Sequence, residues 1–380
     1  MARPAGTPHS VLGTPRKATV SMTEEPLREG TMKAVVFHGP GDMSWEKVPL
    51  PQIIDETDAV IRVDTTTICG TDLHILKGDV PEVTPGRILG HEAVGTVESV
   101  GVGVKRVHIG DRVLVSCITA CGTCEYCRKG MYGQCSAGGG WILGHTTNGV
   151  QAQYARIPLA DTSLYRVPEG LTDEQVLMLS DIMPTGFEIG VLSGAVEPGC
   201  SVAIIGAGPI GLSALLGARM YSPKRVILID PDANRLGVAT KWGADAVVNN
   251  STHNATDAVM ALTDRCGVDV AIEAVGTPET FELATSLVKP GGHIANIGVH
   301  GKPALLHLET LWTKNVTITA GLVNTTSTPM LLDLVHSGKL DTSRFVTHRF
   351  AMDSFMEAYD VFRNAASNQA LKVVVSREHI

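Results

Sequence analysis

The segment AIIGAGPIGLSALL (Ala203–Leu216) decides the fold, because it joins an apolar strand to a glycine-rich turn and then to a helix. Its glycines Gly206, Gly208 and Gly211 form a G-x-G-x-x-G pattern. The first glycine of such a pattern allows a tight turn, the second lets the backbone approach a diphosphate, and the third lets the helix pack on the strand. Pro209 stands early in the helix, where its missing N–H costs nothing. The segment therefore predicts a dinucleotide-binding turn with a helix N-terminus facing the phosphates.

Asp230 ends the next predicted strand, VILID, nineteen residues after Gly211. A carboxylate there accepts hydrogen bonds from the adenine ribose and repels a 2′-phosphate, which favours NAD over NADP. Arg235 argues the other way, because a nearby arginine can bind that phosphate. A strand, turn and helix without any ligand is the structural alternative. The predicted cofactor contacts of this segment are Gly206, Gly208, Pro209, Ile210, Gly211, Asp230 and Arg235.

Short apolar runs alternate with helical patterns from about Cys200 onward: SVAIIG, RVILID, AVVN, DVAIEAVG, GGHIANIG and NVTITAG. This alternation predicts a parallel sheet with crossover helices, and six such strands complete a doubly wound Rossmann sheet. Between Lys33 and about Pro168, by contrast, Gly, Pro and Asp punctuate short strands, which predicts a β-rich, barrel-like domain. The last strand, ALKVVVS, has no βαβ partner, so the C-terminal segment is expected to return to the first domain.

The sequence thus predicts a discontinuous two-domain protein with a cleft between the domains, where sites tend to lie. We expect a disordered N-terminal tail over 1–31, a catalytic domain over 32–182 and 322–380 with a cysteine-rich lobe at about 117–140, and a cofactor-binding domain over 183–321.

Composition excludes some functions. The formal net charge of −8 argues against non-specific nucleic-acid binding, which needs a basic face. No apolar run reaches the about eighteen residues of a membrane span. We expect a cytoplasmic protein, although the basic start of the tail (Arg3, Arg16 and Lys17) weakly resembles an organellar transit peptide.

Four of the eight cysteines, Cys121, Cys124, Cys127 and Cys135, are spaced C-x2-C-x2-C-x7-C. Disulfides between thiols so close in sequence would be strained. The spacing suits four thiolates around one zinc ion, while an iron–sulfur cluster and unligated thiols remain alternatives. Four thiolates fill a tetrahedral shell, so a zinc ion there would be structural. The chemistry must then lie elsewhere.

A catalytic zinc needs three protein ligands and one open position, and Cys69, His91 and Asp181 are candidates that spacing alone cannot join. Gly90-His91-Glu92 followed by Gly95, Gly101 and Val104, the cysteine lobe and the glycine fingerprint together resemble the zinc-containing medium-chain alcohol dehydrogenases. The resemblance covers nearly all of 32–376 and implies a β-rich GroES-like catalytic domain plus a Rossmann domain. It matches Cys69, His91 and Asp181 to the catalytic zinc ligands. The aspartate is similar to the bacterial secondary-alcohol branch, since the liver-type enzymes have a cysteine there.

The resemblance implies further roles. Glu92 matches an acidic neighbour of the ligands that binds the metal in some members, or else lies behind them. Thr71 and His74 match a proton relay. The nicotinamide ring is expected at Thr185 and at Ile297, Gly298 and Val299, the diphosphate at Lys372, and the substrate at Thr71 and Trp141. Ordinary surface roles are the alternative for His74 and Lys372, and plain packing is the alternative for Trp141.

The predicted function is reversible oxidation of an alcohol to an aldehyde or ketone with hydride transfer to NAD, using one catalytic and one structural zinc per chain. Polyol, threonine-type and formaldehyde dehydrogenases of the same fold are alternatives. From other classes, a non-catalytic NAD-binding module would need a broken ligand set, and the acidic charge disfavours a zinc-ribbon nucleic-acid binder. The expected partners are small alcohols or carbonyls, with no nucleic acid and no membrane. The resemblance also implies a homotetramer or homodimer joined through the Rossmann sheets.

Overall fold

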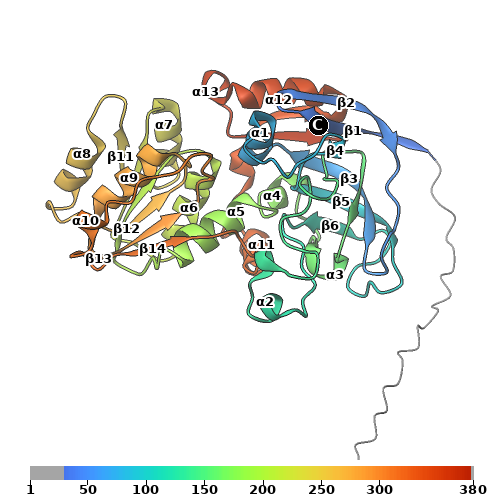
Figure 1. The fold of residues 1–380 in the computed structure, drawn as a ribbon, viewed down its shortest axis with the longest axis horizontal. Coiled ribbons are helices and arrows are strands. Elements are labelled where there is room, and N and C mark those ends of the chain that lie inside the picture. The colour runs from blue at the N-terminus through green and yellow to red at the C-terminus, as the bar shows by residue number, and fades with distance from the viewer. Residues whose placement is uncertain (1–29, 378–380) are drawn as a thin grey trace, which may run out of the picture.

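The computed structural model describes residues 30–377, which form a β-rich part and a part built on a parallel sheet (Figure 1). The predicted tail over 1–31 lies outside these residues except at its end, where the first strand already begins at Thr31. Within residues 30–377, the longest apolar helices fall short of what is needed to cross a membrane.

The parallel sheet has six strands in the order β11-β10-β9-β12-β13-β14, and every neighbouring pair is parallel. The strands are β9 (Ser201–Ile205), β10 (Arg225–Asp230), β11 (Ala246–Asn249), β12 (Val268–Glu273), β13 (Val288–Asn296) and β14 (Thr317–Ala320). The strand order reverses between β9 and β12, which is where such sheets bind their ligands. The predicted doubly wound Rossmann sheet is confirmed.

Helices cover both faces of this sheet (Figure 1): α6 (Pro209–Arg219), α7 (Ala233–Lys241), α8 (Ala255–Leu262), α9 (Pro278–Leu287) and the short α10 (Leu308–Leu311). Successive residues of β9 belong to different cores, since Val202 and Ile204 pack on one face and Ala203 and Ile205 on the other. This alternation follows from the two-residue period of a strand and explains why the run is apolar throughout.

The β-rich part contains a seven-stranded sheet with the order β15-β16-β3-β5-β6-β8, in which β7 also pairs with β3, and a small sheet with the order β2-β1-β4. The strands are β1 (Thr31–Gly39), β2 (Asp42–Pro49), β3 (Ala59–Thr67), β4 (Arg87–Ile88), β5 (Ala93–Val100), β6 (Arg112–Val115), β7 (Tyr154–Ile157), β8 (Leu164–Arg166), β15 (Val346–Ala351) and β16 (Lys372–Ser376). Because β16 pairs antiparallel with β3, the end of the chain returns to the first part, as predicted.

Short helices decorate this part and link it to the parallel sheet. They are α1 (Gly70–Lys77), α2 (Glu125–Arg128), η1 (Tyr132–Gln134), α3 (Ala160–Ser163), α4 (Asp173–Leu177), α5 (Ile182–Thr185), η2 (Gly186–Leu192), α11 (Thr328–His336), η3 (Ser343–Phe345), η4 (Met352–Ser354), α12 (Phe355–Arg363) and α13 (Ala365–Asn368). One hydrophobic core runs from Leu114 of β6 through Met183 of α5 to Leu215 of α6. The link α5–η2 is therefore packed into both parts and holds one against the other (Figure 1).

Candidate active site

Three predicted metal ligands converge although 22 and 90 residues separate them in sequence. Cys69 is the N-cap of α1, His91 precedes β5, and Asp181 is the N-cap of α5. The Asp181 Oδ2 atom lies 3.3 Å from His91 Nε2 and 3.6 Å from Cys69 Sγ. Together with Glu92, these residues offer ligand atoms that all lie within 4.8 Å of one another.

This spacing fits a metal ion. Tetrahedral zinc with ligand bonds of about 2.0–2.3 Å holds neighbouring ligand atoms about 3.3–3.8 Å apart. The His91–Asp181 and Cys69–Asp181 distances of 3.3 and 3.6 Å lie within that range. The donors are one sulfur, one nitrogen and one carboxylate oxygen, which is a set that zinc accepts and that leaves one position open.

The charges at the cluster also favour a cation. Burial alone would lower the pKa of His91, but hydrogen bonds with Asp181 and Cys69 raise it well above its usual value. Burial would raise the pKa of Asp181, yet the hydrogen bond and charge of His91, together with the Thr185 hydroxyl and the charge of Lys372, bring that pKa below the usual range. A site that draws a proton onto a fully buried imidazole attracts a divalent cation for the same reason.

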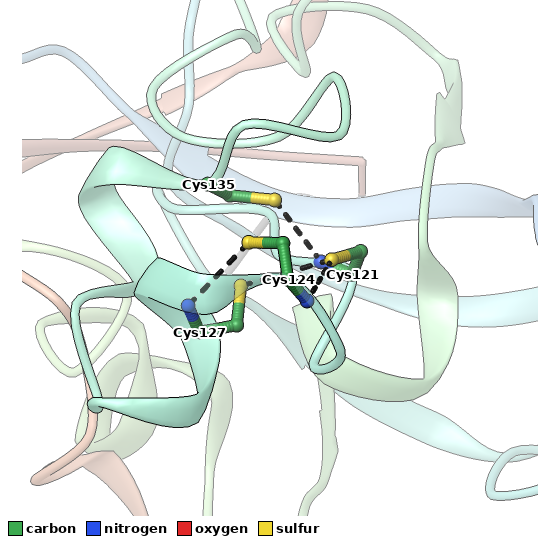
Figure 2. Close-up of side chains that lie close together, drawn as sticks. All are labelled: Cys121, Cys124, Cys127 and Cys135. Atoms are coloured by element: carbon green, nitrogen blue, oxygen red, sulfur yellow. Dashed lines mark hydrogen bonds between the residues drawn. The ribbon is translucent and has the colours of Figure 1, made fainter.

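The four closely spaced cysteines form a second cluster in the lobe around α2 (Figure 2), with their sulfur atoms within 4.8 Å of one another. The Cys121 and Cys127 sulfurs are 3.8 Å apart, matching the about 3.8 Å expected for two thiolates on one tetrahedral zinc. Hydrogen bonds from the Cys127 and Ser136 backbone lower the pKa of Cys124 to about 5. Burial raises the pKa of Cys127 to about 12. The lobe thus fits a zinc ion held by four sulfurs, with no room for a substrate.

Lys372 lies against Glu92, next to the predicted metal ligands. Its side chain is 1% exposed, and its ammonium donates to both Glu92 carboxylate oxygens at 2.8 and 3.0 Å and to the Ile68 carbonyl. Burial alone would lower the pKa of Lys372, but the charge and hydrogen bonds of Glu92, together with the nearby Cys69 and Asp181, raise it above its usual value. The expected contact with the diphosphate stays a prediction, which the NAD⁺ KM of a Lys372 variant tests. Because Lys372 begins β16 next to β3, its side chain is directed to the Glu92 carboxylate behind the ligands.

The two predicted relay residues lie on α1. The Thr71 hydroxyl is 3.6 Å from Cys69 Sγ, next to the ligand cluster. His74 follows one turn later and is partly exposed, with Nδ1 bound to Asp79 Oδ2 at 2.8 Å. The structure brings Thr71 to the cluster and leaves His74 between it and solvent.

Thr185 contacts a ligand directly, because its hydroxyl donates to Asp181 Oδ1 at 2.7 Å. Ile297 packs with Trp141 around a small apolar cluster of Cys117, Ile118, Ile189 and Val323. The Trp141 ring also lies edge-on to His91, with centroids 6.4 Å apart, and stacks on His145. Gly298 follows β13 close to the Glu273 carboxylate, and Val299 is exposed. Thr185, Trp141 and Ile297 thus lie at or next to the metal cluster, whereas Gly298 lies against the turn after β12.

The glycine-rich turn has the expected shape. Gly206 has a φ of +99°, which favours glycine, and a side chain at Gly211 would collide with the Gly206 carbonyl. Gly208 caps α6, with Pro209 and Ile210 as the first helical residues. Asp230 accepts hydrogen bonds from the Ala207 and Asp232 backbone N–H groups at 2.7 and 2.8 Å. Arg235 lies beside the glycine-rich turn, because its Nη1 atom would be 3.8 Å from a Cβ atom added to Gly208.

Sequence reasoning missed three buried residues near this site. Cys117 Sγ lies 3.6 Å from Asp181 Oδ1. Asp72 accepts from the Cys69 backbone N–H and from the Gln151 amide, each at 2.9 Å. Glu188 of η2 binds a loop far along the chain. Cys117 and Asp72 each lie within four residues of a predicted metal ligand, which was a usable signal, whereas Glu188 belongs to no local pattern.

Comparison with known proteins agrees with this geometry. Residues 55–169 match the family described as the alcohol dehydrogenase GroES-like domain, and residues 209–337 match the zinc-binding dehydrogenase family. An alcohol dehydrogenase of Cupriavidus necator is 39% identical over 370 residues, covering 90% of this chain and 98% of its own.

Solved structures resemble the fold as well. The apo form of zinc dependent alcohol dehydrogenase 2 from Streptococcus pneumonia superposes with a TM-score of 0.88 at 49% identity, covering 92% of this chain and 99% of its own. An alcohol dehydrogenase from E. coli CFT073 complexed with NADH gives a TM-score of 0.82 at 26% identity, covering 91% and 99%. These relatives are similar along almost their whole length. Of the predicted ligands, Cys69 and His91 lie within the first matched region, and Asp181 lies between the two. The chain belongs to the zinc-containing medium-chain alcohol dehydrogenase family and is a zinc-dependent alcohol oxidoreductase.

Proposed function

We propose that the protein oxidises alcohols with an apolar substituent to aldehydes or ketones, reversibly, with NAD as hydride acceptor and Cys69, His91 and Asp181 as catalytic zinc ligands. The convergence of these three side chains beside the cofactor-binding sheet carries the proposal. The protein's own domain division is proposed to follow 32–182 with 322–380, and 183–321, so that the site lies at their boundary.

When bound, zinc supplies a Lewis acid for the substrate oxygen and NAD accepts the hydride. The chain's own groups then manage the proton. Thr71 stands beside the ligands, so its hydroxyl is placed to accept a hydrogen bond from the substrate. His74 is partly exposed and bound to Asp79, which suits it to pass a proton to solvent. No hydrogen bond joins Thr71 to His74 within residues 30–377, so Thr71 would hold the proton next to the substrate and His74 would release it to solvent, and a bound cofactor would supply the hydroxyl between them.

The substrate class follows from the apolar cluster next to the ligands. Ile118, Ile189 and Val323 are buried there, and Trp141 and Ile297 pack against them. A polyol would need hydrogen-bonding partners for several hydroxyls, and these side chains offer almost none. The lining therefore supports an aliphatic or aromatic alcohol over sorbitol, threonine or formaldehyde hydrate.

A substrate panel tests this proposal. We expect NADH formation with aliphatic and benzylic alcohols at kcat/KM values at least about tenfold above those for polyols. The measurement is NADH absorbance on purified protein of known metal content, with NADP⁺ as the comparison cofactor. A clear preference for sorbitol or threonine would contradict the proposed substrate class while leaving the zinc ligands in place.

The four-sulfur lobe supports a second, structural zinc, giving two ions per chain. Thiols that must stay reduced to bind metal also support the predicted cytoplasmic location.

Asp230 supports the choice of NAD. We expect Asp230→Gly to lower kcat/KM with NAD⁺ about 10- to 100-fold through loss of hydrogen bonds to the ribose, and to move preference towards NADP⁺. The ratio of the two kcat/KM values is the readout, because it cancels any general loosening of the turn that Asp230 also binds. Asp264→Gly is the control, since Asp264 is exposed and has a positive φ of 51° that glycine accepts. An unchanged ratio would remove Asp230 from cofactor selection.

We further propose a homodimer or homotetramer joined through the edge strand β14. This strand is last in the sheet order, and the segment before it exposes Leu305, Leu308 and Trp312, the last of these at 75%. Unpaired edges and exposed apolar side chains together favour a protein partner. Light scattering measures the subunit number directly.

A further inference from the structure

The Glu188 side chain joins two segments that are far apart in sequence. It belongs to η2, in the link by which the chain leaves the β-rich part, and it binds the loop 324–327, by which the chain returns. The residue is 6% exposed. Oε2 accepts from the backbone N–H groups of Asn324 and Thr325 at 2.9 and 3.1 Å. Oε1 accepts from the backbone and hydroxyl of Ser327 at 2.8 and 2.7 Å. One side chain thus joins the two segments that connect the β-rich part to the parallel-sheet part, which are η2 and the loop 324–327 (the two crossings).

The same loop is also fastened to the β-rich part. The Thr325 hydroxyl is 2.9 Å from the Ser116 hydroxyl, and the Gly133 N–H of the cysteine lobe donates to Asn324 Oδ1 at 3.0 Å. Thr325 has a φ of +58°, which is unfavourable for a β-branched residue and persists only where its surroundings impose it. The Thr325 N–H donates to Glu188 and its hydroxyl bonds that of Ser116, and these two hydrogen bonds supply that constraint.

Glu188 lies on the same short helical stretch as the site residues. Asp181 caps α5, Thr185 ends it and binds the Asp181 carboxylate at 2.7 Å, and Glu188 follows in η2. The η2 stretch is π-helical, a form that is often found at functional sites. Ser116, on the other side of the loop, precedes Cys117, whose sulfur also contacts Asp181. A shift of the loop against η2 would therefore act on Asp181 from both sides.

A carboxylate is suited to this position and an amide is not. Glu188 receives backbone N–H groups and a hydroxyl on both oxygens. Glutamine would turn its NH₂ group towards N–H donors, so at least one pair of them would lose its acceptor. The exchange Glu188→Gln keeps the size and shape of the side chain and removes only one of its two hydrogen-bond-accepting oxygens.

We propose that Glu188 is a positioning residue for the dehydrogenase reaction, which fixes the two crossings so that the metal ligand Asp181 keeps its place relative to the nicotinamide. The inference rests on the proposed function for its kinetic readout. It assigns Glu188 no contact with substrate, cofactor or metal.

The test compares Glu188→Gln with Glu197→Gln, the same change at an exposed glutamate outside the site. We expect Glu188→Gln to lower kcat up to about 100-fold, because a displacement of about 1 Å costs that much. The primary deuterium isotope effect on kcat should rise as hydride transfer becomes rate-limiting. NADH affinity and zinc content should stay close to those of Glu197→Gln. A merely structural residue would lower NADH affinity, zinc content and kcat together and leave the isotope effect unchanged.

Equal kcat and isotope effect in Glu188→Gln and Glu197→Gln would overturn the proposal, as would the pattern of a merely structural residue. If Glu188→Gln does not fold, Ser327→Ala decides, because it removes one donor to Glu188; an unchanged isotope effect there overturns the proposal.

If the wild type oxidises no alcohol, the proposed function has failed. Hydrogen exchange then decides the inference: the Asn324, Thr325 and Ser327 amides should exchange faster in Glu188→Gln than in Glu197→Gln, and equal rates overturn it.

Discussion

Replacing Asp181 with alanine should lower kcat for alcohol oxidation by at least about 10³-fold and remove one metal ion per chain, leaving one of the proposed two. A zinc Lewis acid contributes several kcal/mol to such a reaction, and each 1.36 kcal/mol is about tenfold in rate. The Asp181 carboxylate lies 3.3 Å from His91 and 3.6 Å from Cys69, so its loss leaves two of three donors. Two donors hold the ion far more weakly than three.

The fold should survive this change. Asp181 lies at the start of α5, and the Cys121–Cys135 lobe keeps its own four sulfurs. Zinc analysis after dialysis, NADH absorbance and a thermal melt measure the three expected outcomes. Asp333→Ala, at an exposed position of α11, is the matched control.

Asp181→Cys sharpens the interpretation, because a thiolate is also a zinc ligand and carries the same charge. It should keep two ions per chain while Asp181→Ala keeps one. Full metal and full activity in Asp181→Ala would remove Asp181 from the ligand set and leave Glu92 as the remaining carboxylate of the cluster.

The sequence alone was sufficient for much of the fold. The Rossmann strands could be predicted because each is a short apolar run bounded by glycine or a helix start, and these local signals agree with the final topology. The cysteine lobe could be predicted because its ligands are local. Cys69, His91 and Asp181 could be joined only through family resemblance, since pairing of β3 with β5 and the path of α5 bring them together over long distances.

Other site residues have no signature in the sequence. Glu188 contacts a loop about 140 residues later, and no periodicity reveals such a partner. Lys372 was assigned to the diphosphate because it matches a basic residue of the family that reaches the diphosphate. A match of single residues does not show the partner of a buried side chain, and in the structure the Lys372 ammonium contacts Glu92.

Replacing Lys372 with methionine should destabilise the protein by roughly 3–5 kcal/mol, because removing one partner of a buried ion pair leaves the other charge uncompensated. Both side chains of the Lys372–Glu92 pair are 1% exposed. Glu92 would then lose its ammonium partner while it shares its surroundings with the Cys69 and Asp181 donors. Thermal and urea unfolding of the zinc-loaded protein measure the loss, which should lower Tm by on the order of 10 °C.

Two further variants decide how this loss arises. Lys33→Met breaks an exposed pair with Asp353 and should cost less than about 1 kcal/mol. Adding Glu92→Gln to Lys372→Met should recover most of the stability, because the uncompensated charge is removed with its partner.

Since the ammonium is bound to Glu92 and buried, the NAD⁺ KM of Lys372→Met should change less than about threefold. A KM rise of more than about tenfold with unchanged Tm would instead return Lys372 to the diphosphate, since losing one charged hydrogen bond to a phosphate costs roughly 1.5–3 kcal/mol of binding.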